Sequence, residues 1–329
     1  ALGGEDVKRA LGLGEIMVQM NPTEKGALRF QTLFERHVAG SEANTIIQMQ
    51  RMGVECSFLT AVGADEFGKV ILSSLRSEGV STRGVIEDRS NPTGVYFVQR
   101  SYPVPNKTMV FYYRKDSAAA HFGPENLKEE FFVDLDLFLV SGITPALSDS
   151  CNRAALKSIE MARKSGAQIA FDTNIRINLL KTKENAIKVL EPFVRKADIL
   201  FTGTGDMAML FGNDSEVARE KVIEMAESAH IIVFKRGSDG VEALVNGKRY
   251  SVPSYKVPVI DELGAGDACD GAFLASYLQG KSIEDSLRYA NVAGAITVSL
   301  KGDIEPLPDW QAIETFLNVH GAGEKRLLR

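Results

Sequence analysis

The chain has one short stretch in which small residues are followed at once by a carboxylate, namely Gly264, Ala265, Gly266 and Asp267. Small residues allow a sharp turn that brings backbone N–H groups close to a ligand, and the residues after this turn have helical periodicity. Because the first turn of a helix has unpaired N–H groups and a partial positive charge, it attracts phosphate. Asp267 would repel phosphate, but it could accept a proton from a hydroxyl that attacks the phosphorus. The residues alone leave a second interpretation equally open, in which Asp267 only caps the helix.

Alternating strands and helices are predicted around this motif from Asp136 onward. Short apolar runs such as 137–141 and 168–172 alternate with longer helical segments such as 152–164 and 183–197. This alternation is typical of a parallel sheet that is covered by helices on both faces. We therefore predict an α/β fold with a central, mostly parallel sheet flanked by helices.

Two polar segments follow predicted strands, at the edge where open α/β sheets bind ligands. The first contains Asn174 and Arg176, and the second contains Lys235, Gly237 and Gly240. From position alone, a surface location is favoured for Arg176 over contact with an anion. A tight turn would be enough to explain the glycines.

The N-terminal third contains a polar helix start and a group of aromatic strands. Gly40 and Asn44 belong to a segment that opens a helix, and a tight turn would be enough to explain it. Strands are predicted over 93–100 and 107–114, while 27–38 has the mixed composition of a solvent-facing flap. Packing explains the tyrosines of these strands more simply than binding does.

A P-loop spacing, Gly-x-x-x-x-Gly-Lys, occurs from Gly63 to Lys69, but its chemistry does not fit. Val70 has no hydroxyl for Mg²⁺, and the carboxylates of Asp65 and Glu66 would face the phosphates. We therefore expect no Walker-type site here and predict that Asp65 caps a helix.

The composition argues against several classes of protein. The net charge of −5 and the isoelectric point of about 5.6 argue against a nucleic-acid surface. No apolar run approaches the roughly 20 residues of a membrane span, and the three cysteines have neither disulfide nor zinc spacing. We expect a cytoplasmic protein that acts on a small molecule, without nucleic-acid or membrane partners. Residues 1–10 are interpreted as a leader or tag.

The stretch from Gly264 to Asp267, preceded by Asp261, resembles the C-terminal signature of the ribokinase-like (PfkB) sugar kinases. The segment from Gly40 to Asn44 resembles the N-terminal signature of the same family. The resemblance covers nearly the whole chain, from residue 11 to about residue 317. It implies that the three small residues form an anion hole for a γ-phosphate and that Asp267 is the base acting on a sugar hydroxyl.

The resemblance also implies binding residues and a division of the chain. For the sugar these residues are Gly40, Asn44, Tyr96, Tyr112, Arg114, Arg176 and Asp303. For the nucleotide they are Asn174, Lys235, Gly237, Ser238, Gly240 and Asn291. Residues 27–38 and 93–118 would form a β-lid, residues 11–26, 39–92 and 119–317 the α/β core, and residues 318–329 a tail.

Residues 112–118 are similar to a segment characteristic of the family's kinases for 2-keto-3-deoxygluconate. The resemblance therefore implies an enzyme that uses ATP and Mg²⁺ and phosphorylates a primary hydroxyl of a sugar acid, with 2-keto-3-deoxygluconate as the first candidate. Arg114 and Arg176 would provide the preference for an acid, because an arginine fork can hold both carboxylate oxygens. We also expect a homo-oligomer.

Two alternatives stay open. The first is a kinase for a neutral sugar, of the fructokinase or ribokinase type. The second is a non-catalytic sugar-binding regulator on the same scaffold. Its motivation is Glu262, where the family usually has threonine, and Gly203, where many relatives have asparagine.

Overall fold

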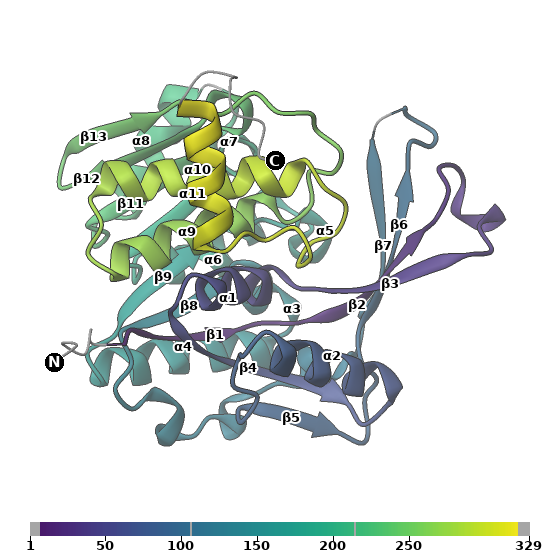
Figure 1. Cartoon of the computed structure of the whole chain (residues 1–329). Helices are drawn as coiled ribbons and strands as arrows, with labels where there is room; N and C mark the ends of the chain where they lie inside the picture. The colour runs from purple at the N-terminus through teal and green to yellow at the C-terminus, as the bar shows by residue number, and fades with distance from the viewer. Residues whose placement is uncertain (1–6, 106, 214, 322–329) are drawn as a thin grey trace, which may run out of the picture.

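The computed structural model describes residues 7–105, 107–213 and 215–321. Its larger sheet contains β1 (Arg9–Leu13), β4 (Glu55–Gly63), β5 (Val85–Asp88), β8 (Leu137–Ser141), β9 (Gln168–Asp172), β10 (Ile199–Gly203), β11 (Ile231–Lys235), β12 (Val241–Val245) and β13 (Lys248–Val252). The strand order is β13-β12-β11-β10-β9-β8-β1-β4-β5 (Figure 1). All neighbours from β11 to β5 pair in parallel, whereas β11, β12 and β13 pair antiparallel. The predicted α/β fold is confirmed.

Helices cover both faces of this sheet. They are α1 (Ser41–Arg51), α2 (Glu66–Ser77), α3 (Ile143–Leu147), α4 (Asp149–Lys164), α5 (Ile177–Leu180), α6 (Lys183–Val194), α7 (Thr204–Phe211), α8 (Ser215–Met225), α9 (Ala265–Leu278), α10 (Ile283–Val298) and α11 (Trp310–Gly321). Phe58 and Phe273 are buried in the core on one face, and Phe138 and Phe193 in the core on the other. All five residues of β8 are buried, as expected for a strand covered on both sides. Within the described residues, no helix is long and apolar enough to cross a membrane.

Short 3₁₀ helices occur in the connections between these elements. They are η1 (Leu28–Phe30), η2 (Ala118–His121), η3 (Pro124–Asn126), η4 (Glu129–Phe132) and η5 (Gly237–Asp239). The predicted helix start at Asp65 is confirmed. The Asp65 carboxylate accepts a hydrogen bond from the Gly68 N–H at the start of α2, and the Ser282 hydroxyl caps α10 at Asp285.

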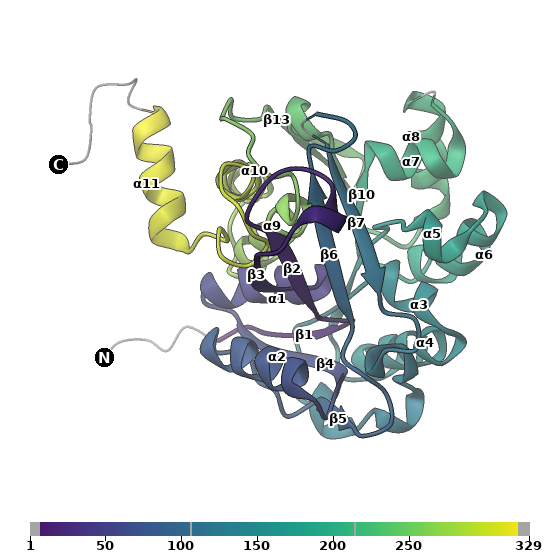
Figure 2. The same ribbon diagram turned by 90° about the vertical axis from the view of Figure 1, so that its right-hand side faces the viewer.

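A second sheet of four strands projects from one side of the larger body (Figures 1 and 2). Its order is β3-β2-β6-β7, from strands β2 (Met17–Pro22), β3 (Phe34–Ala39), β6 (Val95–Arg100) and β7 (Thr108–Tyr113). The prediction that residues 11–26 belong wholly to the core is wrong for β2. Met17 and Val18 are buried because the inner face of the small sheet packs on the body, so the strand has the apolar pattern of a core strand.

Two chain ends also differ from the predicted division. Arg9 and Ala10 belong to β1, so the interpretation of residues 1–10 as a leader or tag is wrong at its end, and residues 1–6 lie outside the described part. Residues 318–321 continue α11, so the predicted tail begins too early.

Candidate active site

The helix α9 begins at a tight turn with a left-handed residue. Gly264 has φ = +75°, and a Cβ atom there would lie 3.2 Å from the Asp303 carbonyl oxygen. Glycine meets both requirements without strain. The first turn of α9 therefore presents its unpaired backbone N–H groups next to Asp267, and these groups attract an anion.

This turn lies between two cavities. Ala265 and Gly266 line a cavity of about 720 Å³, whereas Gly264 and Asp267 line one of about 80 Å³ beneath the small sheet. A group held in the first cavity could thus meet a group held in the second at the N-terminus of α9. This is the geometry that group transfer between two ligands requires.

Asp267 is held by two side chains of the α1 start. Its carboxylate accepts hydrogen bonds from the Ser41 hydroxyl at 2.7 Å and the Asn44 amide at 2.8 Å. Burial raises the pKa of Asp267 above its ordinary value, and these two hydrogen bonds oppose the rise. The Asn174 amide in turn donates to the Ser41 hydroxyl at 2.5 Å. Ser41 was missed by the sequence reasoning, although it directly follows Gly40 of the recognised segment.

A partly buried cation lies under the turn. The Lys235 ammonium is 2.9 Å from carboxylate oxygens of both Asp172 and Asp270, and 3.6 Å from where a Cβ on Gly266 would be. Burial opposes the charge of Lys235, but the two carboxylates outweigh it and hold its pKa well above the ordinary value. Asp172 and Asp270 were not predicted as site residues. Asp270 lies one helical turn after Asp267, which is the signal that could have revealed it.

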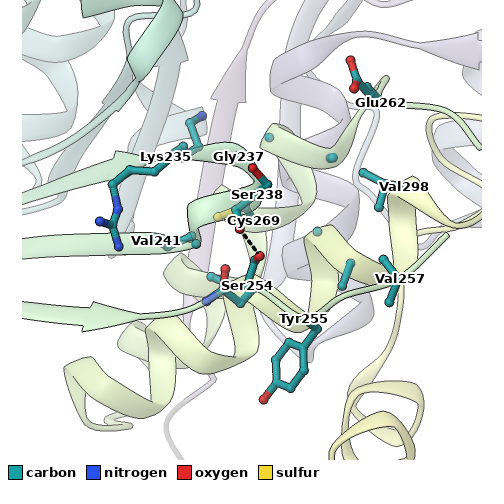
Figure 3. A pocket seen from close by; sticks show the side chains of 18 of the residues that line it. Lys235, Gly237, Ser238, Val241, Ser254, Tyr255, Val257, Glu262, Cys269 and Val298 are labelled. Atoms are coloured by element: carbon teal, nitrogen blue, oxygen red, sulfur yellow. Dashed lines mark hydrogen bonds between the residues drawn. The ribbon is translucent and has the colours of Figure 1, made fainter. Parts of the chain in front are cut away.

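The larger cavity is formed by the segment after β11, by α10 and by the start of α9 (Figure 3). Of the residues predicted to bind nucleotide, it is lined by Lys235, Gly237, Ser238, Gly240 and Asn291. Gly240 has φ = +95°, and a Cβ there would lie 2.1 Å from the Val252 carbonyl oxygen. The Asn291 amide donates to the same oxygen at 3.0 Å and so fixes the wall. Asn174 does not line this cavity, because it lies beside Ser41 near the smaller one.

The smaller cavity brings together all seven residues predicted to bind sugar. They are Gly40, Asn44, Tyr96, Tyr112, Arg114, Arg176 and Asp303. Glu15 and Glu42 also line it, and neither was predicted. Burial raises the pKa of Glu42, whose carboxyl accepts hydrogen bonds from the Ser141 and Thr144 hydroxyls at 2.7 Å.

The two arginines of this cavity differ in their charge partners. Arg114 donates from Nε and Nη2 to one Glu15 oxygen at 2.6 and 2.5 Å, and both side chains are buried. The Ser117 hydroxyl donates to the other Glu15 oxygen at 2.6 Å. Within the described residues Arg176 has no ion pair and donates only to the Ile175 carbonyl at 3.3 Å. Arg176 is therefore the cation of this cavity whose charge is not balanced by any described residue.

Asp303 is a buried carboxyl whose pKa lies near neutrality. It accepts a hydrogen bond from the Gln19 amide at 3.2 Å, and the Tyr96 hydroxyl donates to its other oxygen at 3.4 Å. Burial, together with the nearby charge of Asp267, raises the pKa of Asp303 to about 7.

We predict that Asp303 makes the stability of the ligand-free protein depend on pH. Its folded-state pKa of about 7 lies above the ordinary 3.8, so the folded protein keeps a proton that the unfolded chain loses between these values. The free energy of unfolding contributed by Asp303 therefore falls as pH rises from about 4 to about 7, by at most roughly 4 kcal/mol. Asp303→Asn cannot titrate and should escape this fall. Denaturant titrations between pH 4 and pH 8 should show the stability of the wild type declining relative to the variant, and a constant difference would contradict the prediction.

Comparisons with known proteins agree with this arrangement. The family pattern described as pfkB family carbohydrate kinase matches residues 8–310. The chain is 40% identical to a 2-dehydro-3-deoxygluconokinase of Thermoproteus tenax over 94% of both chains, and 30% identical to fructokinase-1 of rice over 91% of this chain and 94% of the other. A structure of an E. coli protein described as ribokinase II, in complex with ATP and Mg²⁺, has a TM-score of 0.87 at 26% identity and covers 95% of this chain and all of the other.

Proposed function

Because the chain belongs to the pfkB family of carbohydrate kinases, we propose that it transfers the γ-phosphoryl group of ATP to a primary hydroxyl of a sugar acid, with 2-keto-3-deoxygluconate as the first candidate. The observation that carries the proposal is the turn at Gly264, which joins a large cavity to a small one at the start of a helix. ATP would occupy the larger cavity, with its γ-phosphoryl group at the turn. The sugar would occupy the smaller cavity beside Asp267.

In this arrangement the protein contributes positioning and charge. Asp267 would accept the proton of the attacking hydroxyl, while Ser41 and Asn44 hold its carboxylate in place. The N–H groups of the α9 turn would stabilise charge on the equatorial phosphoryl oxygens, while the Lys235 ammonium below them is held between Asp172 and Asp270. The small sheet would act as a lid that excludes water, which could otherwise accept the phosphoryl group.

Mg²⁺ fits this site as a companion of the nucleotide. Among residues 7–105, 107–213 and 215–321, no group of three His, Cys, Asp or Glu side chains could hold a metal ion. Mg²⁺ usually retains several waters and is bound through substrate phosphates with one or two carboxylates. Asp206, whose carboxylate accepts hydrogen bonds from the Thr173 hydroxyl and the Ile175 N–H, is our candidate for such a ligand. When bound, the ion would neutralise phosphate charge.

The preference for a sugar acid is supported by the unbalanced cation in the smaller cavity. A carboxylate enclosed by a lid needs a fixed cation, since an unpaired buried charge is costly. Arg176 can provide it, whereas the charge of Arg114 is already balanced by Glu15. The relative of Thermoproteus tenax is named for 2-dehydro-3-deoxygluconate, the same compound as 2-keto-3-deoxygluconate.

A coupled assay of ADP release tests the proposal directly. Purified protein with ATP and Mg²⁺ would be offered 2-keto-3-deoxygluconate, related aldonic keto-acids, fructose and ribose. We expect turnover with the keto-acids and little with the neutral sugars. Equal turnover of fructose would favour the neutral-sugar alternative, which the similarity to a fructokinase motivates. Sugar binding without any ADP release would favour a regulator.

We also propose that the protein is a homo-oligomer that forms through the small sheet. β7 is an edge strand, and Met109, Phe111 and Tyr113 are exposed on the face opposite to Val110 and Tyr112, which line the smaller cavity. An exposed apolar edge strand is a ready surface for a second copy of the chain. Sedimentation velocity at micromolar concentration should show an oligomer that Tyr113→Lys dissociates. A monomeric wild type would contradict this.

A cytoplasmic location is likewise our proposal. Cys56, Cys151 and Cys269 are all free and buried, which is compatible with a reducing compartment. Its partners would be small molecules and other copies of the chain.

A further inference from the structure

A chain of buried polar side chains leads from the smaller cavity into the small sheet. It begins at Asp303, to which the Gln19 amide of β2 donates at 3.2 Å. The side-chain carbonyl oxygen of Gln19 accepts a hydrogen bond from the side-chain amide of Asn21, which lies two residues further along the same strand. Gln19 and Asn21 are completely buried, so these contacts are not exchanged for water. Buried hydrogen bonds of this kind favour one geometry.

An arginine links the same series of buried polar side chains to the body of the protein. Arg100, at the end of β6, donates from Nη2 to the Asn21 carbonyl oxygen at 2.8 Å and to the Asp261 carboxylate at 2.7 Å. Asp261 is buried, and its other oxygen accepts from the Leu263 N–H at 3.2 Å. Leu263 directly precedes Gly264. The contacts therefore form a circuit from the sugar cavity, through the small sheet, to the turn that would hold the phosphoryl group.

The circuit closes at its two ends. The Asp303 backbone packs against Gly264, where an added Cβ would lie 3.2 Å from the Asp303 carbonyl oxygen. On the other side, the N–H groups of Ile260 and Asp261 donate to the Val298 carbonyl of α10 at 2.7 and 3.2 Å. The loop before the turn is thus anchored on α10, and its remaining freedom is limited by Arg100.

Arg100 has a feature that packing alone does not explain. Its Nε atom is buried and has no hydrogen-bond partner within the described residues, although its Nη2 makes two bonds. An unpaired buried donor costs free energy and calls for an explanation in a native protein. The position of the guanidinium provides this explanation. Its Nη2 must lie between Asn21 of the small sheet and Asp261 of the loop before the turn, and this position leaves Nε without an acceptor.

We propose that this circuit couples occupancy of the sugar cavity to the geometry of the phosphoryl-binding turn, with Arg100 as the positioning residue that joins lid to turn. The inference rests on the proposed kinase function. A sugar that contacts Asp303 and Tyr96 would fix β2 and β6, and these strands would fix the Asp261 loop through Arg100. The turn then binds the nucleotide more tightly when the lid is closed on a sugar, which limits transfer of the phosphoryl group to water.

The test is the thermodynamic coupling between the two ligands. Calorimetry would measure the affinity for a non-hydrolysable ATP analogue with Mg²⁺, with and without saturating 2-keto-3-deoxygluconate. We expect the sugar acid to tighten wild-type binding of the analogue on the order of tenfold, within the usual range for coupled sites. In Arg100→Gln the shift should fall below about twofold, and kcat should fall by about tenfold or more because the turn is misplaced.

Two variants separate this role from a structural one. Arg36→Gln makes the same change at an exposed arginine of β3 in the same sheet and should retain the coupling. Should Arg100→Gln not fold, Asp261→Asn keeps the shape of the acceptor but removes its charge, and it should also weaken the coupling. Wild-type coupling in a folded Arg100 or Asp261 variant, or an equal loss in Arg36→Gln, would overturn the proposal.

Hydrogen exchange distinguishes this inference from the proposed function. If the wild type phosphorylates none of the sugars, the proposed function is wrong, but the link from turn to lid can still be measured without a sugar. Binding of the ATP analogue should slow amide exchange in β2 and β6 of the wild type and not of Arg100→Gln. The same slowing in both proteins would overturn the link itself.

Discussion

Asp267→Asn should lower kcat by on the order of 10²- to 10⁴-fold, which is the usual contribution of a general base. Asparagine has nearly the same shape, so it can still accept from Ser41 or Asn44, but it cannot take a proton from the attacking hydroxyl. The backbone turn does not depend on the Asp267 side chain, because its geometry comes from Gly264. Binding of ATP should therefore change little. Steady-state kinetics with saturating sugar and nucleotide would measure the effect.

The control for this prediction is Asp239→Asn, which makes the same change at an exposed aspartate of η5 near the larger cavity. It should keep kcat within about twofold, as expected for a surface substitution outside the site. Thermal unfolding of both variants would show whether either has lost its fold. A folded Asp267→Asn protein with near-normal kcat would remove Asp267 from the mechanism and leave it as a helix cap.

The parts of the site that could be predicted from the sequence are those whose chemistry is local. Gly264 precedes a helical segment directly, and both its positive φ and the start of α9 follow from residues within one turn. The β12-β13 hairpin is likewise predictable, because the Asn246-Gly247 pair adopts the positive φ values that its tight turn requires. In each case the determining interactions join neighbours in the sequence.

The charge partners could not be predicted, because they come from distant elements. Asp172 and Lys235 meet only when β9 and β11 stand on either side of β10 in the sheet, 63 residues apart in the sequence. Glu15 and Arg114 are separated by 99 residues and by the border between the two sheets. A carboxylate in an apolar run has no periodic signal that would identify its partner.

The boundary of the small sheet was misplaced for a related reason. The chain passes from β1 to β2 with only Gly14, Glu15 and Ile16 between the strands. Hydrophobic pattern reports which residues are buried, and Met17 and Val18 are as buried as a core strand. It does not report which sheet they pair with, since that depends on β3 and β6.

The separate positions of the two arginines change the expectation for substrate preference. The sequence suggested equal roles for Arg114 and Arg176, but Arg114 is buried against Glu15. Removal of Arg114 would leave Glu15 as an unpaired buried charge, which typically costs about 3–5 kcal/mol of stability. We therefore expect Arg114→Ala to lower the melting temperature and to slow phosphorylation of acid and neutral sugars to the same extent. It serves as the comparison for Arg176.

Arg176→Ala should reduce kcat/KM for 2-keto-3-deoxygluconate by roughly tenfold to a hundredfold while turnover of fructose barely changes. A hydrogen bond to a charged group contributes about 1.5–3 kcal/mol, and this range converts to that loss. Arg176 is half-buried and has no ion pair within the described residues, so its removal leaves no unpaired carboxylate in the protein.

The identity of the cation gives the second half of this test. Arg176→Lys retains the charge but loses the planar fork that holds both carboxylate oxygens, so its activity on the acid should lie between those of wild type and Arg176→Ala. A rise in KM with little change in kcat would mean that Arg176 binds the acid equally in ground and transition states. If Arg176→Ala slows phosphorylation of 2-keto-3-deoxygluconate and of fructose to the same extent, the arginine does not recognise the carboxylate. The neutral-sugar alternative then becomes the better account. Among the described residues, the other cation that lines the smaller cavity is Arg114, and Glu15 already balances its charge.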